Sequence, residues 1–342
     1  MKASILKNLK KWKFTEIPTP NTYDQNKYAL IKLTLNGICS TDVLRSMQTG
    51  FYNYPIVPGH EMIGKVFNIK NNNKFKKGDR VAVYPLIQCN NCKYCKNKKP
   101  NLCDSYSFLG SRTNGGYAEY VLAPIRNLIK IPNEVSDKKA VFTEPLAVTL
   151  HSFNIAEKQF KPKNILILGL GPIGLLVALW AKSKGYKNVT GIDRNANRFK
   201  IFRKIGYNKC INSNKINLSS LVNSNNNFDT VFECSGSTKL QEIGITITEK
   251  QGQFVLLSNP NDDLIMNKSL YSKILRGEIN FRGSWSSLIT PYNEWAYSLK
   301  MMKKKSFDPS ILISKKIKLS QLPEIIPKMY NKKFPFIKIV VN

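Results

Sequence analysis

The hydrophobic and polar positions of this chain follow two different patterns, which change near residue 150. The first part contains short stretches in which apolar and polar residues alternate, separated by glycine and proline; residues 29–33, 63–67 and 79–83 are examples. A period of two is typical of strands with one buried face. The first part therefore predicts a β-rich, barrel-like domain.

After Pro162 the pattern changes to short apolar runs followed by helix-like stretches. The runs are residues 164–168, 189–192, 230–233 and 254–257. Strands that alternate with helices predict a parallel sheet with crossover helices, so we expect an α/β fold class. The longest apolar run, residues 165–180, contains three glycines and a proline and is shorter than the ~20 residues that span a bilayer. We expect no transmembrane segment.

The bulk composition is that of a globular protein. The chain has 342 residues, 42% of them hydrophobic and 22% charged, which suffices for two domains and argues against a disordered or fibrous protein. Residues 1–13 are basic but lack the apolar core of a signal peptide. We therefore expect a cytoplasmic protein, in which clustered cysteines are more often metal ligands than disulfides.

The net charge of +31 is high for an enzyme. Such a charge can attract nucleic acid, anionic membranes or phosphorylated small molecules. The lysines are dispersed among asparagines, as in residues 71–74, and do not form a stripe. The high charge is therefore better explained by a general bias of the sequence toward lysine and asparagine than by a binding surface. We expect neither nucleic acid nor a membrane as partner.

Four closely spaced cysteines indicate a structural metal site. Cys89, Cys92, Cys95 and Cys103 have the spacing C-x2-C-x2-C-x7-C, which can close one tetrahedron around zinc and leaves no open position. The alternative is a basic zinc ribbon that binds nucleic acid. That alternative leaves the motifs described next unexplained.

A second set of candidate ligands is spread along the first part of the chain. Cys39 lies in a polar turn, His60 precedes Glu61, and Glu144 precedes a proline; only two histidines occur in the sequence. A Cys/His/Glu set can bind zinc with a position left open for water or substrate. Each residue also has a structural alternative: Cys39 as a buried apolar side chain, His60 as a loop residue and Glu144 as a helix cap.

A glycine-rich turn follows the predicted strand 164–168 and opens a predicted helix, 175–184. Its residues are Gly169, Gly171, Pro172, Ile173 and Gly174, in the pattern G-x-G-x-x-G. In this context the glycines let the backbone approach a pyrophosphate at a helix N-terminus.

An acidic residue supports this interpretation. Asp193 ends the next predicted strand, about 20 residues on, where a carboxylate can accept hydrogen bonds from ribose hydroxyls. NAD is therefore favoured over NADP. Arg194 is the counterargument, because a guanidinium there could bind a 2′-phosphate.

Together these motifs resemble the zinc-dependent medium-chain dehydrogenase/reductase family, in its polyol dehydrogenase branch, over essentially the full length. Residues 54–61, 108–112, 115–120, 144–148, 273–276 and 283–285 also carry the resemblance. It implies a GroES-like β-rich catalytic domain, residues 1–152 and 292–342, around an inserted NAD-binding Rossmann domain with a doubly wound parallel sheet, residues 153–291. It also implies a homodimer or homotetramer.

The resemblance assigns roles to the candidate ligands. Cys39, His60 and Glu144 would bind catalytic zinc, with Glu61 as a nearby carboxylate that ligates directly or through water, and the four clustered cysteines would bind a second zinc. Thr41 would accept the hydroxyl proton of the substrate. Further expected cofactor contacts are Arg198, Leu257 and Lys338.

One departure from the family bears on the substrate. Many relatives carry a relay histidine five residues after the zinc cysteine, where this chain has Leu44, followed by Arg45. The resemblance to the sugar-phosphate members of this branch makes Arg45 and Arg112 candidates to bind the phosphate of a phosphorylated sugar alcohol, since guanidinium pairs phosphate bidentately. Phe51 and Trp285 would form an apolar wall. The alternatives are an uncharged polyol or threonine as substrate, with both arginines merely solvated.

Overall fold

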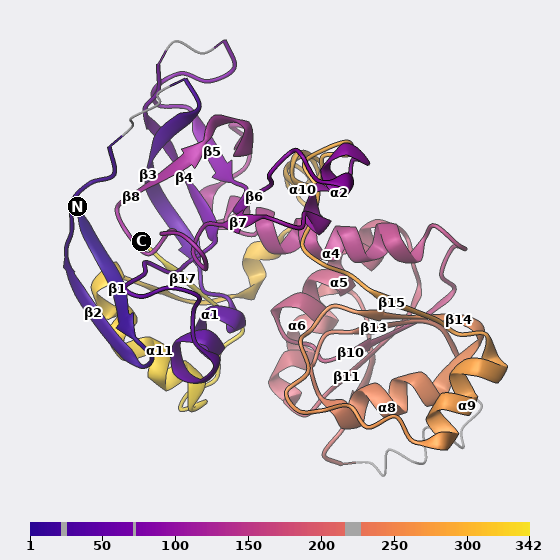
Figure 1. The fold of residues 1–342 in the computed structure, drawn as a ribbon. Helices are drawn as coiled ribbons and strands as arrows, with labels where there is room; N and C mark the ends of the chain where they lie inside the picture. Colours follow the sequence, from indigo (N-terminus) through magenta and orange to yellow (C-terminus); the bar gives the residue numbers. More distant parts are fainter. Residues whose placement is uncertain (22–25, 71–72, 216–226) are drawn as a thin grey trace. The chain divides into compact units, whose positions relative to one another are not determined.

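The computed structural model in Figure 1 describes residues 1–21, 26–70, 73–215 and 227–342 and divides the chain into two compact units. Unit 1 comprises Met1–Ala147 and Ser287–Asn342, and unit 2 comprises Val148–Ser286. The resemblance placed the two boundaries slightly later, after residue 152 and before residue 292, and that division by function stays a prediction.

Unit 1 is built on a seven-stranded sheet. Its strand order is β16-β17-β3-β4-β5-β9, with β8 paired to β3. The strands are β3 (Tyr28–Gly37), β4 (Glu61–Asn68), β5 (Arg80–Val83), β8 (Tyr120–Pro124), β9 (Leu128–Lys130), β16 (Ile313–Ile317) and β17 (Lys338–Val341). The three alternating stretches of the sequence lie on β3, β4 and β5. Strand β17 pairs antiparallel with β3, so the second part of unit 1 completes the sheet begun by the first.

Short elements complete unit 1. Two small sheets pair β1 (Lys2–Asn8) with β2 (Lys11–Glu16) and β6 (Leu86–Ile87) with β7 (Ser107–Phe108). The helices are α1 (Ser40–Leu44), continued by a π-helical turn (Arg45–Thr49), α2 (Lys93–Lys96), α3 (Asp137–Ala140), α10 (Glu294–Met302) and α11 (Leu322–Tyr330). Helix α4 (Thr143–Ala156) runs from unit 1 into unit 2.

Unit 2 is a parallel six-stranded sheet with helices on it. The strand order is β12-β11-β10-β13-β14-β15. The strands are β10 (Asn164–Leu168), β11 (Asn188–Asp193), β12 (Lys209–Asn212), β13 (Phe228–Glu233), β14 (Thr248–Leu256) and β15 (Asn280–Gly283), and the helices are α5 (Pro172–Ser183), α6 (Ala196–Ile205), α8 (Thr238–Ile247) and α9 (Lys268–Gly277). The expected doubly wound sheet is confirmed. Its order reverses between β10 and β13, and ligands bind outside the carboxyl ends of the strands at such a switch point.

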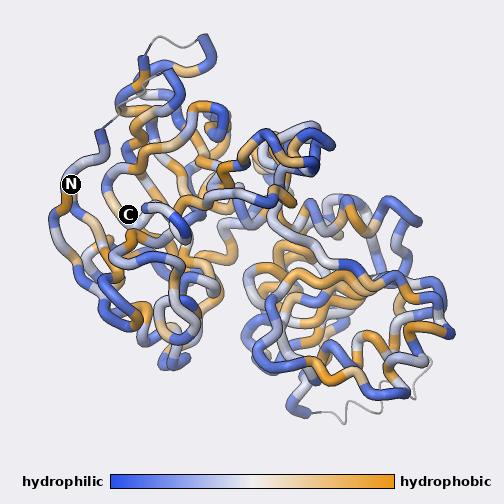
Figure 2. The backbone as a smooth tube through the Cα atoms, in the orientation of Figure 1, coloured by the Kyte–Doolittle hydropathy of each residue, from blue (hydrophilic) through white to orange (hydrophobic). Residues whose placement is uncertain are grey.

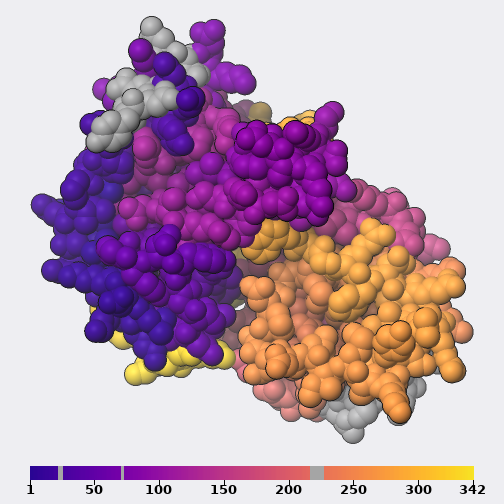
Figure 3. Space-filling model, in the orientation of Figure 1, coloured from indigo at the N-terminus to yellow at the C-terminus, as the bar shows by residue number. Residues whose placement is uncertain are grey.

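Burial follows the hydropathy pattern. Figure 2 shows apolar positions concentrated on the strands of both units. Strand β10 is almost wholly buried, which explains why it reads as a continuous apolar run, and β13 is fully buried although Asp229, Thr230 and Glu233 are polar. On the face drawn in Figure 3, α8, α9 and their neighbouring loops cover unit 2. Among the described residues, no helix is long and apolar enough to cross a membrane.

Helix α5 begins three residues earlier than the sequence pattern predicts. Gly171 is its N-cap and Pro172 its first residue. Proline suits this position because its missing N–H would have no partner in the first turn of a helix. The glycine turn is therefore itself the start of the helix.

Candidate functional site

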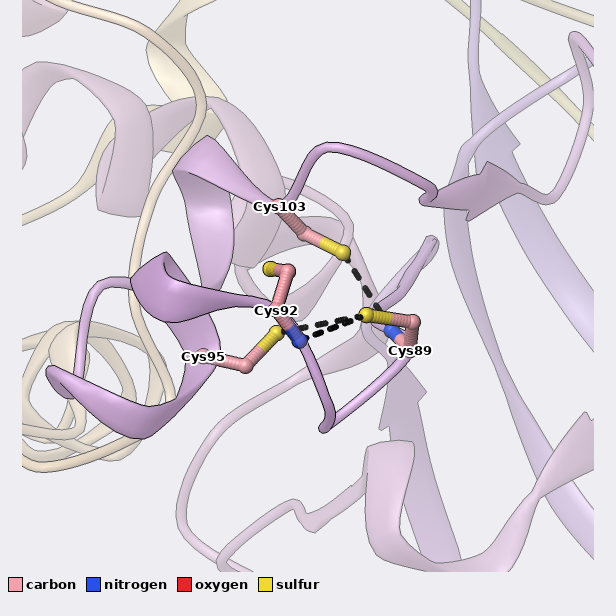
Figure 4. Close-up of side chains that lie close together, drawn as sticks. All are labelled: Cys89, Cys92, Cys95 and Cys103. Atoms are coloured by element: carbon pink, nitrogen blue, oxygen red, sulfur yellow. Dashed lines mark hydrogen bonds between the residues drawn. The ribbon is translucent and has the colours of Figure 1, made fainter.

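The four clustered cysteines converge in the segment between β6 and β7. Figure 4 shows the side chains of Cys89, Cys95 and Cys103 pointing into a common space, with Cys92 beside them. All four sulfur atoms lie within 4.8 Å of one another. The backbone N–H of Cys89 donates to Cys103 Sγ at 3.3 Å, and the N–H of Cys92 donates to Cys89 Sγ at 3.4 Å. Such bonds favour the thiolate form that binds metal.

The titration of these thiols also fits a cation. The backbone N–H groups of Cys95 and Asp104 lower the pKa of Cys92 to about 6. Desolvation and the neighbouring Cys92 raise the pKa of Cys95 to about 12. The lowered pKa of Cys92 favours its thiolate, and a divalent cation held by the four sulfur atoms would offset the desolvation that raises the pKa of Cys95. The donor set suits zinc.

A second cluster forms where β3 ends and β4 begins. The metal-ligating atoms of Cys39, His60 and Glu61 lie within 4.8 Å of one another. Gly37 pairs with Glu61 across the two antiparallel strands, which brings Cys39 next to the start of β4. A Cβ on Gly37 would lie 1.8 Å from Glu61 Oε2, so glycine at this position leaves room for the carboxylate.

Glu144, the fourth expected ligand, does not join this 4.8 Å set. It stands in the first turn of α4. Burial raises the pKa of Glu144 to about 7, while the charges of His60 and Glu61 act on it in opposite directions. The carboxyl group therefore interacts electrostatically with the same cluster, and its role as a ligand stays a prediction.

Asp42 and Tyr117 support the cluster and were not anticipated from the sequence. Asp42 is only 1% exposed; its Oδ1 lies 3.2 Å from His60 Nδ1, and its Oδ2 accepts a hydrogen bond from the Tyr117 hydroxyl at 2.8 Å. The His60 N–H is not well aligned with the carboxylate, but no other polar group satisfies it. A carboxylate at Nδ1 leaves Nε2 as the metal-binding nitrogen.

Asp42→Asn should weaken zinc binding and lower kcat by about ten- to a hundredfold. Removing the carboxylate that bonds the second ring nitrogen of a metal-ligating histidine has an effect of this size in other metalloproteins. The measurement is the dissociation constant of zinc at the Cys39, His60 and Glu61 site, from competition with a chelator, together with kcat. Asp79→Asn, which breaks the pair of Asp79 with Lys130 in the same unit, is the matched control. Equal zinc retention by both variants would contradict the role of Asp42.

Lys338 also belongs to this cluster. It is 3% exposed, and its ammonium pairs with the carboxylate of Glu61, which is 2% exposed. Burial lowers the pKa of Lys338, but the charges of Glu61 and Cys39 outweigh it and the net shift is upward. The lysine therefore balances charge among the candidate ligands. Its expected contact with the cofactor stays a prediction.

The glycine turn of unit 2 leaves open space in front of α5. Gly169 has a φ of +89°, which glycine adopts without strain. A Cβ on Gly174 would lie 1.9 Å from Gly169 O, so glycine is needed for close packing there. At Gly171 a Cβ would meet only Arg198 Nη1, at 3.9 Å. The N-terminus of α5 is thus open to a phosphate-bearing group.

Asp193 holds this turn in place. The carboxylate is 3% exposed and accepts hydrogen bonds from Leu170 N at 2.8 Å, Asn195 N at 2.7 Å and Arg198 Nη1 at 2.9 Å. Arg198, an expected cofactor contact, is thus ion-paired with Asp193, whereas Arg194 is exposed. These bonds place the carboxylate at the carboxyl end of β11, beside the glycine turn.

Glu233 is a further residue that the sequence interpretation missed. It is fully buried at the end of β13, and its Oε1 accepts from Ser235 N at 2.7 Å and Gly236 N at 2.9 Å. The turn it holds packs against Gly169. Leu257, an expected cofactor contact, donates its N–H to Glu233 O at the end of β14. The cofactor candidates of unit 2 therefore share one edge of the sheet.

Three of the four expected substrate contacts belong to unit 1, and the fourth, Trp285, belongs to unit 2. Arg45 and Arg112 lie 5.1 and 4.3 Å from the ring centroid of Tyr52. Phe51 is 9% exposed and packs in a small cluster with Leu6 and Ile56, which makes it mainly a packing residue. Trp285 is 47% exposed. The substrate roles of all four stay predictions.

Two protein-family models match this chain. Residues 25–133 match the alcohol dehydrogenase GroES-like domain, and residues 172–304 match the zinc-binding dehydrogenase model. The first lies in unit 1 and confirms the GroES-like part of the expected fold class. The second covers the parallel sheet from α5 onward.

Individual relatives are similar along most of their length. Galactitol 1-phosphate 5-dehydrogenase of Escherichia coli K12 is 30% identical, covering 82% of this chain and 83% of its own. The crystal structure of galactitol-1-phosphate dehydrogenase from Escherichia coli superposes with a TM-score of 0.92, at 26% identity, covering 100% of this chain and 99% of that one. D-arabitol-phosphate dehydrogenase of Enterococcus avium is 31% identical, covering 92% and 90%. Sorbitol dehydrogenase of Halalkalibacterium halodurans is 30% identical, covering 89% and 88%.

Proposed function

The chain belongs to the zinc-dependent medium-chain dehydrogenase/reductase family, and on that premise we propose that it oxidises a secondary hydroxyl of a phosphorylated sugar alcohol with NAD. The observation that carries the proposal is the convergence of Cys39, His60 and Glu61 within 4.8 Å in unit 1. Unit 2 adds an open glycine turn suited to a dinucleotide. The proposed homodimer or homotetramer and the cytoplasmic location follow only from the resemblance.

The proposed substrate is galactitol 1-phosphate, oxidised to tagatose 6-phosphate. Two of the relatives carry a phosphorylated polyol in their names. Two arginines of unit 1, Arg45 and Arg112, supply the cationic groups that a phosphate requires. The second candidate is an uncharged polyol, favoured by the equal identity to a sorbitol dehydrogenase. Threonine is a third.

The reaction removes one hydride and one proton from the substrate. The C–H bond at the carbinol carbon breaks, its electron pair and hydrogen pass to the nicotinamide, and the hydroxyl proton leaves as the carbonyl forms. Zinc held by Cys39, His60 and Glu61 or Glu144 would supply a Lewis acid that lowers the pKa of the hydroxyl.

Thr41 is the residue proposed to receive the proton. Its hydroxyl donates to Cys39 Sγ at 3.1 Å, which leaves the oxygen lone pairs available as acceptors for the substrate hydroxyl. Leu44 stands where many relatives carry a relay histidine, so Thr41 would be the group of this chain that holds the hydroxyl proton. Asp42 orients His60, and Lys338 balances the charge of Glu61.

A substrate and cofactor panel tests the proposal. We expect galactitol 1-phosphate with NAD to give the highest kcat/KM when compared with galactitol, sorbitol and threonine, each with NAD and NADP. NADP should be poorer because Asp193 stands at the carboxyl end of β11 beside the glycine turn, where a carboxylate disfavours a 2′-phosphate. The rate is read from the absorbance of the reduced nicotinamide. Higher kcat/KM on a plain polyol or on threonine would favour that candidate, and better turnover with NADP would refute the cofactor assignment.

A further inference from the structure

The guanidinium groups of Arg45 and Arg112, both in unit 1, lie close to the ring of Tyr52. Arg112 Cζ lies 4.3 Å from the ring centroid of Tyr52 and 4.4 Å from that of Tyr106. Arg45 Cζ lies 5.1 Å from the Tyr52 centroid and 5.9 Å from that of Phe51. Contact with an aromatic face holds a guanidinium by its plane and leaves the N–H groups at its edge for other partners.

These two arginines lack compensating charge. Arg80 and Arg198 pair with Asp137 and Asp193, but in the part of the chain that the structure describes no carboxylate pairs with Arg45 or Arg112. Arg112 Nε is buried without a hydrogen-bond partner. Hydrogen bonding and charge from Arg45, together with the charge of Arg112, lower the pKa of Tyr52. Two like charges beside one phenol favour the arrival of an anion.

Short links connect both arginines to the candidate zinc ligands. Arg45 follows α1 directly, and Cys39 is the N-cap of that helix. The backbone N–H of Arg112 donates to Phe108 O at 2.9 Å, and the Phe108 ring meets the His60 ring edge-on at a centroid distance of 5.8 Å. Asn53 Nδ2 donates to Arg112 O at 3.1 Å and so ties the segment bearing Tyr52 to that of Arg112. The whole arrangement lies within unit 1.

We propose that Arg45, Arg112 and the Tyr52 hydroxyl form the subsite that binds the phosphate of the substrate, with Tyr106 as a second aromatic contact that positions Arg112. This inference rests on the proposed function and adds Tyr52 and Tyr106 to the two arginines already proposed to bind the phosphate. Arg112 presents a planar pair of N–H donors, Arg45 presents a second guanidinium, and Tyr52 donates its hydroxyl hydrogen. Tyr52 and Tyr106 were not anticipated from the sequence.

Substitution of each arginine tests the subsite. Arg45→Ala and Arg112→Ala should each lower kcat/KM on galactitol 1-phosphate by roughly ten- to a hundredfold, the effect of losing one charge-assisted pairing. The loss on plain galactitol should be far smaller. The inhibition constant of inorganic phosphate against galactitol turnover should rise in parallel. Arg112→Lys keeps the positive charge but not the planar pair of N–H donors, so its kcat/KM on galactitol 1-phosphate should also fall at least several-fold.

Arg203→Ala is the matched control, because it removes the same charge from an exposed position on α6, outside both candidate metal clusters. It should behave as the wild type on both substrates. Melting temperature and zinc content show whether each variant folds. If Arg112→Ala is misfolded, Arg45→Ala and Arg112→Lys carry the test.

Three results would overturn the subsite. Equal losses on galactitol 1-phosphate and galactitol would show that the arginines act only structurally. Wild-type kcat/KM of both alanine variants on galactitol 1-phosphate, in an enzyme that prefers it, would refute the subsite and leave the proposed function intact. A wild-type enzyme that does not prefer the phosphorylated substrate would refute the phosphate part of the proposed function and the subsite with it.

Discussion

Replacing Cys39 or His60 by alanine should reduce turnover by about a thousandfold or more while the protein still folds. A Lewis acid contributes several kilocalories per mole to such a reaction, and ~4 kcal/mol corresponds to roughly a thousandfold in rate. Each substitution removes one of three converging ligands. The Cys39 side chain caps no backbone N–H of α1, so its loss leaves the helix start intact.

The measurement is kcat on the best substrate of the panel, with zinc content from elemental analysis and the melting temperature as a check on folding. Zinc should fall from two ions per chain to one. Cys210→Ala is the control, because Cys210 lies on β12 outside both clusters. A Cys39→Ala enzyme with wild-type kcat would show that the catalytic zinc is not bound there.

Replacing Cys92 by serine should instead lower stability. The segment around it contains only short elements, namely β6 with 2 residues, α2 with 4 and β7 with 2, which have little stability of their own. Zinc contributes about 10–16 kcal/mol to small zinc-dependent folds, so even a quarter of that, ~3 kcal/mol, would lower Tm by roughly 6–12 °C.

Calorimetry and zinc analysis of Cys92→Ser check this. One zinc per chain should remain, and kcat of the folded enzyme should stay close to the wild-type value, the reverse of the Cys39 result. Cys210→Ser controls for loss of a thiol as such. An unchanged Tm with two zinc ions bound would contradict a structural role for the four-cysteine site.

Local patterns in the sequence were sufficient for the parts of the molecule that depend on near neighbours. The four cysteines span 89–103, and the glycine turn directly follows its strand, so spacing alone predicts both sites. The alternation of apolar runs and helices predicts the parallel sheet for the same reason. The inserted position of unit 2 came instead from the family resemblance, because no local pattern marks the return of the chain to unit 1.

The supporting residues of the metal cluster could not be predicted in this way. Tyr117 reaches Asp42 across 75 residues, and Lys338 reaches Glu61 across 277. Such contacts depend on strand pairing in three dimensions. The resemblance singled out Lys338 only as a cofactor contact, and no local pattern predicts its pairing with Glu61. A signal for Asp42 did exist, since it lies three residues after Cys39.

The pairing of β17 with β3 has a consequence for how the protein is made. Unit 2 is a continuous stretch, Val148–Ser286, and can fold as soon as it leaves the ribosome. Unit 1 cannot, because β17 supplies the strand beside Gly37 and the ammonium beside Glu61. Lys338 is synthesised 299 positions after Cys39. At a synthesis rate of ~5–20 residues per second, about 15–60 seconds pass between the synthesis of β3 and that of its partner strand β17. During that interval the strand edge is unpaired and the Glu61 carboxylate lacks its cation, so this edge is open to pairing with other chains.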